Sequence, residues 1–90
     1  MRLIGREKLQ ALRQNGTEAD KWVRAWMTEV VNAHWKCPGD VTAQFPNVVQ
    51  EGRIFVFPVL SLTWSIDMLI AFPSETALVM DLRSRGINGR

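Results

Sequence analysis

The chain has 90 residues, of which 47% are hydrophobic and 22% charged, and its formal net charge is +2. A chain of this length is expected to form one small domain over residues 1–90, because a second hydrophobic core needs a longer chain. The apolar fraction excludes an intrinsically disordered chain. The single cysteine, Cys37, cannot form an internal disulfide. The fold is therefore expected to depend on packing, in a reducing, cytoplasmic compartment.

Charge is distributed unevenly along the chain. Residues 1–36 hold seven basic and four acidic side chains, whereas residues 37–82 hold one basic and five acidic ones. Residues 83–90, expected to form a basic tail, add three arginines. Two basic segments around an acidic, apolar middle indicate either a polyanion-binding surface or ordinary solvated faces.

The first elements are predicted to be short. Arg2–Ile4 reads as an edge strand, and residues 5–14 read as a short helix with Leu9 and Leu12 on one face. Gly16 marks the end of that helix. Such a short helix needs tertiary packing to persist.

The clearest signal is a helix that begins with a capping box at Thr17 and Asp20. Asp20 and Arg24, one turn apart, are expected to pair weakly on its exposed side. Trp22 and Trp26 are expected in the core, with a nucleic-acid stacking role as the alternative. The helical period predicts a buried face of Ala19, Trp22, Val23, Trp26, Met27, Val30 and Val31.

The middle of the chain reads as a turn followed by extended structure. The helix should end before Pro38, which cannot continue its hydrogen-bond ladder, and Asp40 is placed to cap a helical turn at residues 41–44. Strands are predicted at residues 53–57, 63–72 and 76–82, with the last two joined at residues 73–75. The expected fold is α+β, with two helices packed on a small antiparallel sheet in the order β-α-α-β-β-β.

The apolar run from Ile54 to Phe72 also has the length of a membrane span. Pro58 and Asp67 within it, and polar residues at every second position, favour strands instead. A membrane-associated peptide remains the weakest alternative.

Familiar site chemistry is absent from the sequence. His34 and Cys37 have a metal-ligand spacing, but no second pair completes four ligands, and the glycines form no phosphate-binding loop. We therefore expect no metal or cofactor. Arg83 and Arg85 can supply positive charge at a scissile phosphate, or they can belong to a solvated tail.

The first two thirds of the chain contain a series of short motifs. They are Met1-Arg2-Leu3-Ile4, Trp26, Ala33-His34-Trp35-Lys36-Cys37-Pro38, Val41-Thr42-Ala43-Gln44-Phe45-Pro46 and Gly52-Arg53-Ile54-Phe55-Val56-Phe57. Together they resemble the HigB-type toxins of the RelE superfamily, the mRNA-cleaving partners of type II toxin–antitoxin modules. The resemblance implies two helices on a small antiparallel sheet, a ribosome-bound mRNA substrate and a HigA-like helix-turn-helix antitoxin.

The last third departs from the family pattern. Ser65 and Leu69 stand where the family has an arginine and a lysine, and Arg85 stands where it has a histidine. Arginine stays protonated and cannot shuttle a proton, so weak or absent cleavage is expected. Ser84-Arg85-Gly86, read one nucleotide later, can spell His-Ala-Glu. We hypothesise that a frameshift rewrote this third, and coding DNA without a family-like peptide in the shifted frame would exclude it.

Five residues are the candidates for the site if cleavage survives. Arg83 and Arg85 are the candidates for phosphate contact, and Ser65 is a candidate polar contact in the same catalytic site. Lys36 and Arg53 are candidates for guiding RNA. The alternative is a non-catalytic HigB-like module that binds an antitoxin without cleaving RNA.

Overall fold

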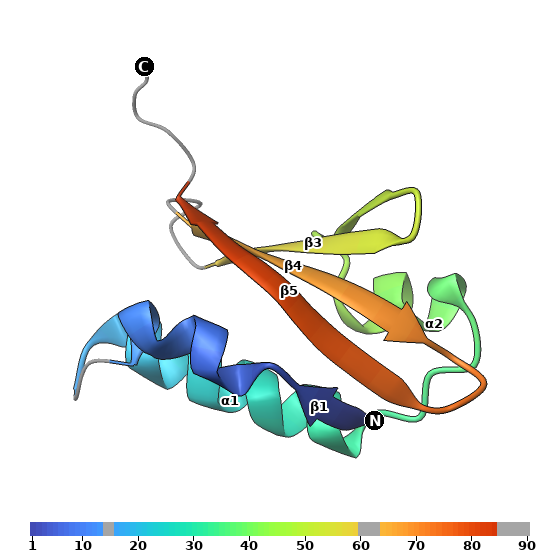
Figure 1. The fold of residues 1–90 in the computed structure, drawn as a ribbon, viewed down its shortest axis with the longest axis horizontal. Helices are drawn as coiled ribbons and strands as arrows, with labels where there is room; N and C mark the ends of the chain where they lie inside the picture. The colour runs from blue at the N-terminus through green and yellow to red at the C-terminus, as the bar shows by residue number, and fades with distance from the viewer. Residues whose placement is uncertain (14–15, 60–63, 85–90) are drawn as a thin grey trace.

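The computed structural model describes residues 1–13, 16–59 and 64–84, with only the backbone of Ser84. In this part of the chain, three helical segments and five strands form an α+β fold (Figure 1). The elements are strand β1 (Arg2–Ile4), 3-10 helix η1 (Arg6–Leu12), helices α1 (Glu18–Asn32) and α2 (Pro38–Gln44), and strands β2 (Val49–Glu51), β3 (Ile54–Val59), β4 (Trp64–Ala71) and β5 (Thr76–Ser84).

The sheet is mixed, with the strand order β1-β5-β4-β3-β2. Neighbouring strands run antiparallel except β1, which pairs with β5 in parallel. The α+β class is confirmed, but the predicted all-antiparallel sheet and the order β-α-α-β-β-β are wrong. The differences are the added strand β2, the added helix α2 and the parallel pairing of β1 with β5, which the long connection between these two strands permits.

Helix α1 begins as the capping box predicts. Thr17 is the N-cap, and its Oγ1 accepts a hydrogen bond from the Asp20 backbone N–H at 3.0 Å. Val23, Trp26 and Val30 are buried, whereas Val31 is 39% exposed, contrary to the predicted buried face. Figure 1 shows α1 lying beside η1 along one side of the sheet.

The expectation that Asp20 lies on the exposed side of α1 is wrong. Its side chain is 5% exposed and binds two arginines: Arg13 Nε at 3.0 Å and Arg24 Nε at 3.1 Å. Burial alone would raise the pKa of Asp20, but the hydrogen bonds and charges of Arg24 and Arg13 outweigh it and lower the pKa below its ordinary value of 3.8. The cluster joins the end of η1 to the first turns of α1.

Helix η1 is tighter and shorter than the helix predicted for residues 5–14. Leu9 and Leu12 are buried as expected. Gly5 enters the helix with φ of 89°, and a Cβ there would lie 2.8 Å from the carbonyl oxygen of Val79. Only glycine lets η1 approach β5 this closely.

Helix α2 begins earlier than predicted, at Pro38 with Cys37 as its N-cap. Proline fits there because the first-turn N–H groups have no partner within the helix. The Asp40 carboxylate does not cap a turn at residues 41–44. It accepts a hydrogen bond from the Lys36 backbone N–H at 2.8 Å, which fixes the chain where it enters α2.

The three long strands lie close to the predicted ranges, and the residues between β4 and β5 form the predicted turn. The spanning-helix alternative for residues 54–72 is wrong, because its described residues form β3 and β4. No helix among the described residues has the length and apolar character needed to cross a membrane.

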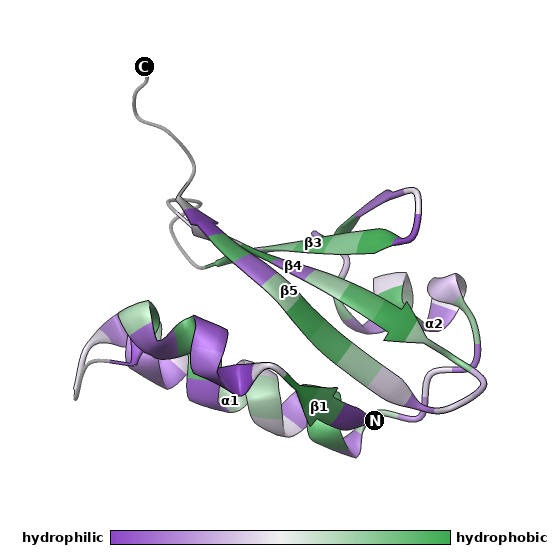
Figure 2. Ribbon diagram, in the orientation of Figure 1, coloured by the Kyte–Doolittle hydropathy of each residue, from purple (hydrophilic) through white to green (hydrophobic). Residues whose placement is uncertain are grey.

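The core lies between the helices and one face of the sheet. Phe57 makes edge-on contacts with Trp26 of α1 and with Phe45 after α2, at centroid distances of 5.4 and 5.3 Å. Figure 2 shows hydrophobic residues running along β3, β4 and β5. Strand residues in this core cluster are Leu3, Phe55, Phe57, Val59, Ile66, Met68, Ile70, Ala77 and Val79.

Candidate functional site

The opposite face of the sheet, here called the open face, carries Ser65 and Arg83, two of the three sequence-predicted catalytic residues. Side chains alternate along a strand, so in β4 Ile66 and Met68 enter the core while Ser65, Asp67 and Leu69 point the other way. Strand register extends this face across β2 to β5. Its members there include Val49, Ile54, Val56, Pro58, Ser65, Asp67, Leu69, Leu78, Asp81 and Arg83.

Strand pairing brings Ser65 and Arg83 together, as two directly opposed residues of β4 and β5. The Arg83 guanidinium binds Asp67 through two contacts, Nε to Oδ2 at 2.8 Å and Nη2 to Oδ1 at 3.0 Å. This fork geometry is the strong form of an arginine–carboxylate pair. A phosphate that approached Arg83 would have to compete with Asp67.

Of the other two predicted catalytic residues, the structure describes Ser65 but not Arg85. Ser65 is 2% exposed although it faces away from the helices, so its hydroxyl is not presented to solvent. Arg85 lies outside the described residues. The structure therefore places two of the three predicted catalytic residues side by side.

Asp81 is a neighbour that sequence analysis did not single out. It lies directly opposite Asp67 across β4 and β5, and its Oδ1 accepts a hydrogen bond from the Leu82 backbone N–H at 2.9 Å. Two carboxylates thus accompany the one guanidinium described at this end of the sheet. Negative charges so close to Arg83 oppose the binding of a phosphate there.

The predicted RNA-guiding residues lie at the other end of the sheet. Arg53 precedes β3, whereas Pro58, near the end of β3, is the residue paired with Ser65. Pro58 follows Arg53 by five positions, which corresponds to about 16 Å along the strand. Arg53 and Arg83 therefore lie near opposite ends of the sheet.

Lys36 lies at the same end as Arg53. It is exposed and follows His34 by two residues, and His34 Nδ1 lies 3.8 Å from a carboxylate oxygen of Glu75 in the turn between β4 and β5. That turn is at the opposite end of β4 from Ser65. The five predicted site residues thus do not form one cluster in the described part of the chain.

Among the described residues of the open face, the titratable groups beside Arg83 are the carboxylates of Asp67 and Asp81, whereas His34 lies at the far end of β4. Within residues 1–13, 16–59 and 64–84, no three His, Cys, Asp or Glu side chains gather as a metal site would require.

The chain was also compared with known proteins. No protein-family model matches it, and no curated protein shows significant similarity to it.

Proposed function

We propose that this chain is a HigB-like toxin of a type II toxin–antitoxin module, a ribosome-dependent mRNA endonuclease whose cleavage activity is attenuated. The motif resemblance over residues 1–57 supports the assignment to this class. The open face holds Arg83 beside Ser65, and the described helices pack on the other side of the sheet, so they do not cover Arg83.

The attenuation rests on one observation, the two-contact pair between Arg83 and Asp67. Phosphoryl chemistry depends on positive charge aimed at the charge that develops in the transition state. Here Asp67 offsets that charge and Asp81 adds a second negative group. Arginine cannot act as a general acid or base at neutral pH, so proton transfer would fall to these two carboxylates or to solvent.

Asp67→Asn is the variant that tests this function. It keeps the shape of the side chain but removes the charge that binds Arg83. Induced expression in a bacterial host should then slow growth more strongly, with mRNA cleavage, mapped by primer extension, increased about tenfold or more. Arg83→Ala should abolish the cleavage that remains.

Asp81→Asn is the matched control, because it removes the same charge from the same face without releasing Arg83. We expect it to increase cleavage less than Asp67→Asn. Equal cleavage by the wild type, Asp67→Asn and Arg83→Ala would contradict an endonuclease that uses Arg83.

A second candidate is a HigB-like module that binds a HigA-like helix-turn-helix antitoxin without cleaving RNA. Two observations favour it, the pairing of Arg83 with Asp67 and the burial of Ser65. Harmless expression of both the wild type and Asp67→Asn, with retained co-purification of the antitoxin encoded beside the gene, would support this candidate over the first.

A further inference from the structure

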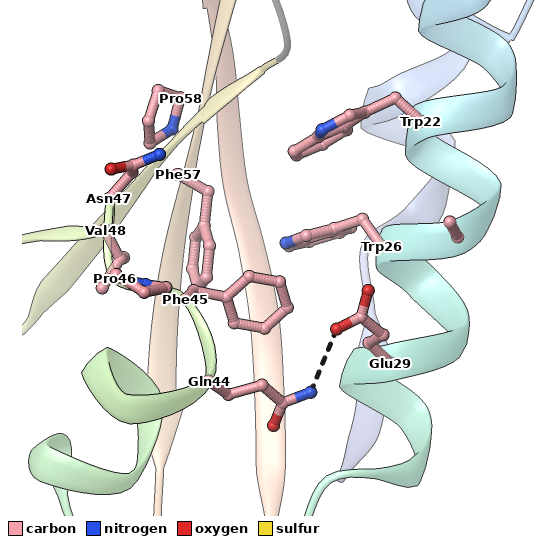
Figure 3. A pocket seen from close by; sticks show the side chains of 11 residues that line it. Trp22, Trp26, Glu29, Gln44, Phe45, Pro46, Asn47, Val48, Phe57 and Pro58 are labelled. Atoms are coloured by element: carbon pink, nitrogen blue, oxygen red, sulfur yellow. Dashed lines mark hydrogen bonds between the residues drawn. The ribbon is translucent and has the colours of Figure 1, made fainter.

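Two pockets that border α1 differ in the charge of their linings. The pocket between α1, residues 44–48 and β3 has aromatic walls, and Glu29, hydrogen-bonded to Gln44, is the one charged residue among its described lining (Figure 3). The other pocket, called the basic pocket below, has no acidic side chain in its described lining. It is lined by Arg6, Arg24, Met27, Thr28, Val31 and Asn32.

The basic pocket lies where η1 and α1 run side by side (Figure 1). Its α1 wall is a stripe of residues three or four positions apart, from Arg24 to Val31, which share one face of the helix. Arg6, the first residue of η1, contributes the other side. The volume is about 410 Å³, which is within the range of small-molecule sites.

The Arg24 guanidinium is held in place by one of its three nitrogens. Its Nε donates to the two carboxylate oxygens of Asp20 at 3.2 and 3.1 Å, whereas neither Nη atom forms a hydrogen bond among the described residues. Arg13 binds the same carboxylate, so two positive charges meet one negative charge there. Arg24 is 58% exposed and retains both Nη groups to receive an oxyanion.

Arg6 supplies the second positive charge of the basic pocket. Its side chain is exposed and forms no ion pair among the described residues. Two guanidiniums with no carboxylate in the described lining match a doubly charged anion. A phosphate monoester carries a charge of about −1.5 to −2 at neutral pH and offers three strong acceptor oxygens, whereas a carboxylate carries a single charge.

Apolar surface beside the two arginines indicates that the anion has an organic part. Val31 is 39% exposed although the helical period groups it with the buried residues of α1, and Met27 below it is 8% exposed. Covering this surface would remove it from water, which is favourable. The Thr28 hydroxyl already donates to the Arg24 carbonyl oxygen at 3.0 Å, so its oxygen can accept from a donor on the ligand.

We propose that the basic pocket binds a small organic phosphate monoester, with the phosphate between Arg6 and Arg24 and the organic part against Val31. This site lies in the helix layer, whereas Ser65 and Arg83 lie on the open face. Ligand binding there does not depend on RNA cleavage and goes beyond the proposed function.

The experiment titrates the protein with phenyl phosphate at low ionic strength and follows the backbone amides of residues 27–32 by NMR. These signals should shift saturably. Inorganic phosphate, which has no organic part, should bind several-fold more weakly. Phenylacetate keeps the ring but carries one negative charge, and should bind about tenfold more weakly than phenyl phosphate.

Arg6→Gln is the main variant, because Arg6 is exposed and unpaired among the described residues, so its loss should leave the fold intact. It should raise the dissociation constant of phenyl phosphate about tenfold. Lys8→Gln is the matched control. It removes the same charge from an exposed position of η1 outside the pocket lining, and should leave the dissociation constant nearly unchanged.

Val31→Ala tests the contact with the organic part. It should weaken the binding of phenyl phosphate and leave that of inorganic phosphate unchanged, since only the first ligand reaches the apolar surface.

Any of three results would overturn the proposal. The first is the absence of a saturable shift of these amides with phenyl phosphate at millimolar concentration. The second is an equal loss of affinity in Lys8→Gln and Arg6→Gln, which would show attraction by net charge without a site. The third is binding of phenylacetate as tight as that of phenyl phosphate, which would identify a carboxylate site, as for an acidic peptide.

Discussion

The helix layer and the open face each hold an aspartate bound by arginine, but the surroundings of the two differ. Asp20 is 5% exposed and binds arginines from two segments, Arg13 after η1 and Arg24 in α1. Asp67 is 15% exposed and binds Arg83, which is 50% exposed. These two residues lie in β4 and β5, which already pair as neighbouring strands. The first cluster holds two elements together, whereas the second mainly sets the charge of the open face.

Apolar side chains show the same contrast between the two regions. Phe57, on the core side of β3, is 2% exposed and contacts two other aromatic rings. Met80, in β5, lies outside the core cluster and is 43% exposed. Burial on the helix side therefore makes the larger contribution to stability.

The largest expected effect comes from Phe57→Ala. Loss of the ring removes its contacts with Trp26 and Phe45 and leaves a cavity, which should lower the free energy of unfolding by about 3–5 kcal/mol. Met80→Ala is the control and should cost about 0.5 kcal/mol. Urea unfolding followed by circular dichroism measures both, and equal losses would contradict the assignment of the core to one face.

The second-largest expected effect is the loss of the Asp20 ion pairs in acid. The folded-state pKa of Asp20 is lowered, so its contribution to stability is complete above the ordinary pKa of 3.8 and is lost as the pH falls through the lower folded-state pKa. Asp20→Asn should melt at a lower temperature than the wild type at neutral pH, and the gap should narrow as the pH falls below 3.8.

Thermal melting across this pH range is the measurement for Asp20. Glu18→Gln, two residues earlier at an exposed position of α1, is the control and should leave the difference between neutral and acidic melting temperatures close to that of the wild type. A gap between wild type and Asp20→Asn that stays constant with pH would show that the carboxylate's charge is not what joins η1 to α1.

Local sequence signals predicted the elements that local interactions determine. The capping box at Thr17 and the helical period found α1, and alternation found β3, β4 and β5. Strand β2 has three exposed residues and thus no alternation to detect. The parallel pairing of Leu3 with Ala77 joins distant parts of the chain, and a single sequence carries no signal for that register.

The same limit explains what was missed at the candidate site. The sequence placed Ser65 and Asp67 on one strand face, and β4 bears this out. It could not show that Arg83 binds Asp67, because that contact depends on the β4–β5 register. The burial of Asp20 likewise depends on Arg13, which comes from a preceding element.

The smallest expected effect concerns the pair on the open face. A double-mutant cycle of Asp67→Asn and Arg83→Gln should give a coupling of about 0.5 kcal/mol, since the guanidinium is half exposed and the strands are already joined by backbone hydrogen bonds. Added salt should reduce the coupling further. A coupling above about 3 kcal/mol would instead identify a buried ion pair that the fold requires. If the coupling is small, loss of the ion pair does not loosen the sheet. Any gain in cleavage by Asp67→Asn then reports the charge released at Arg83.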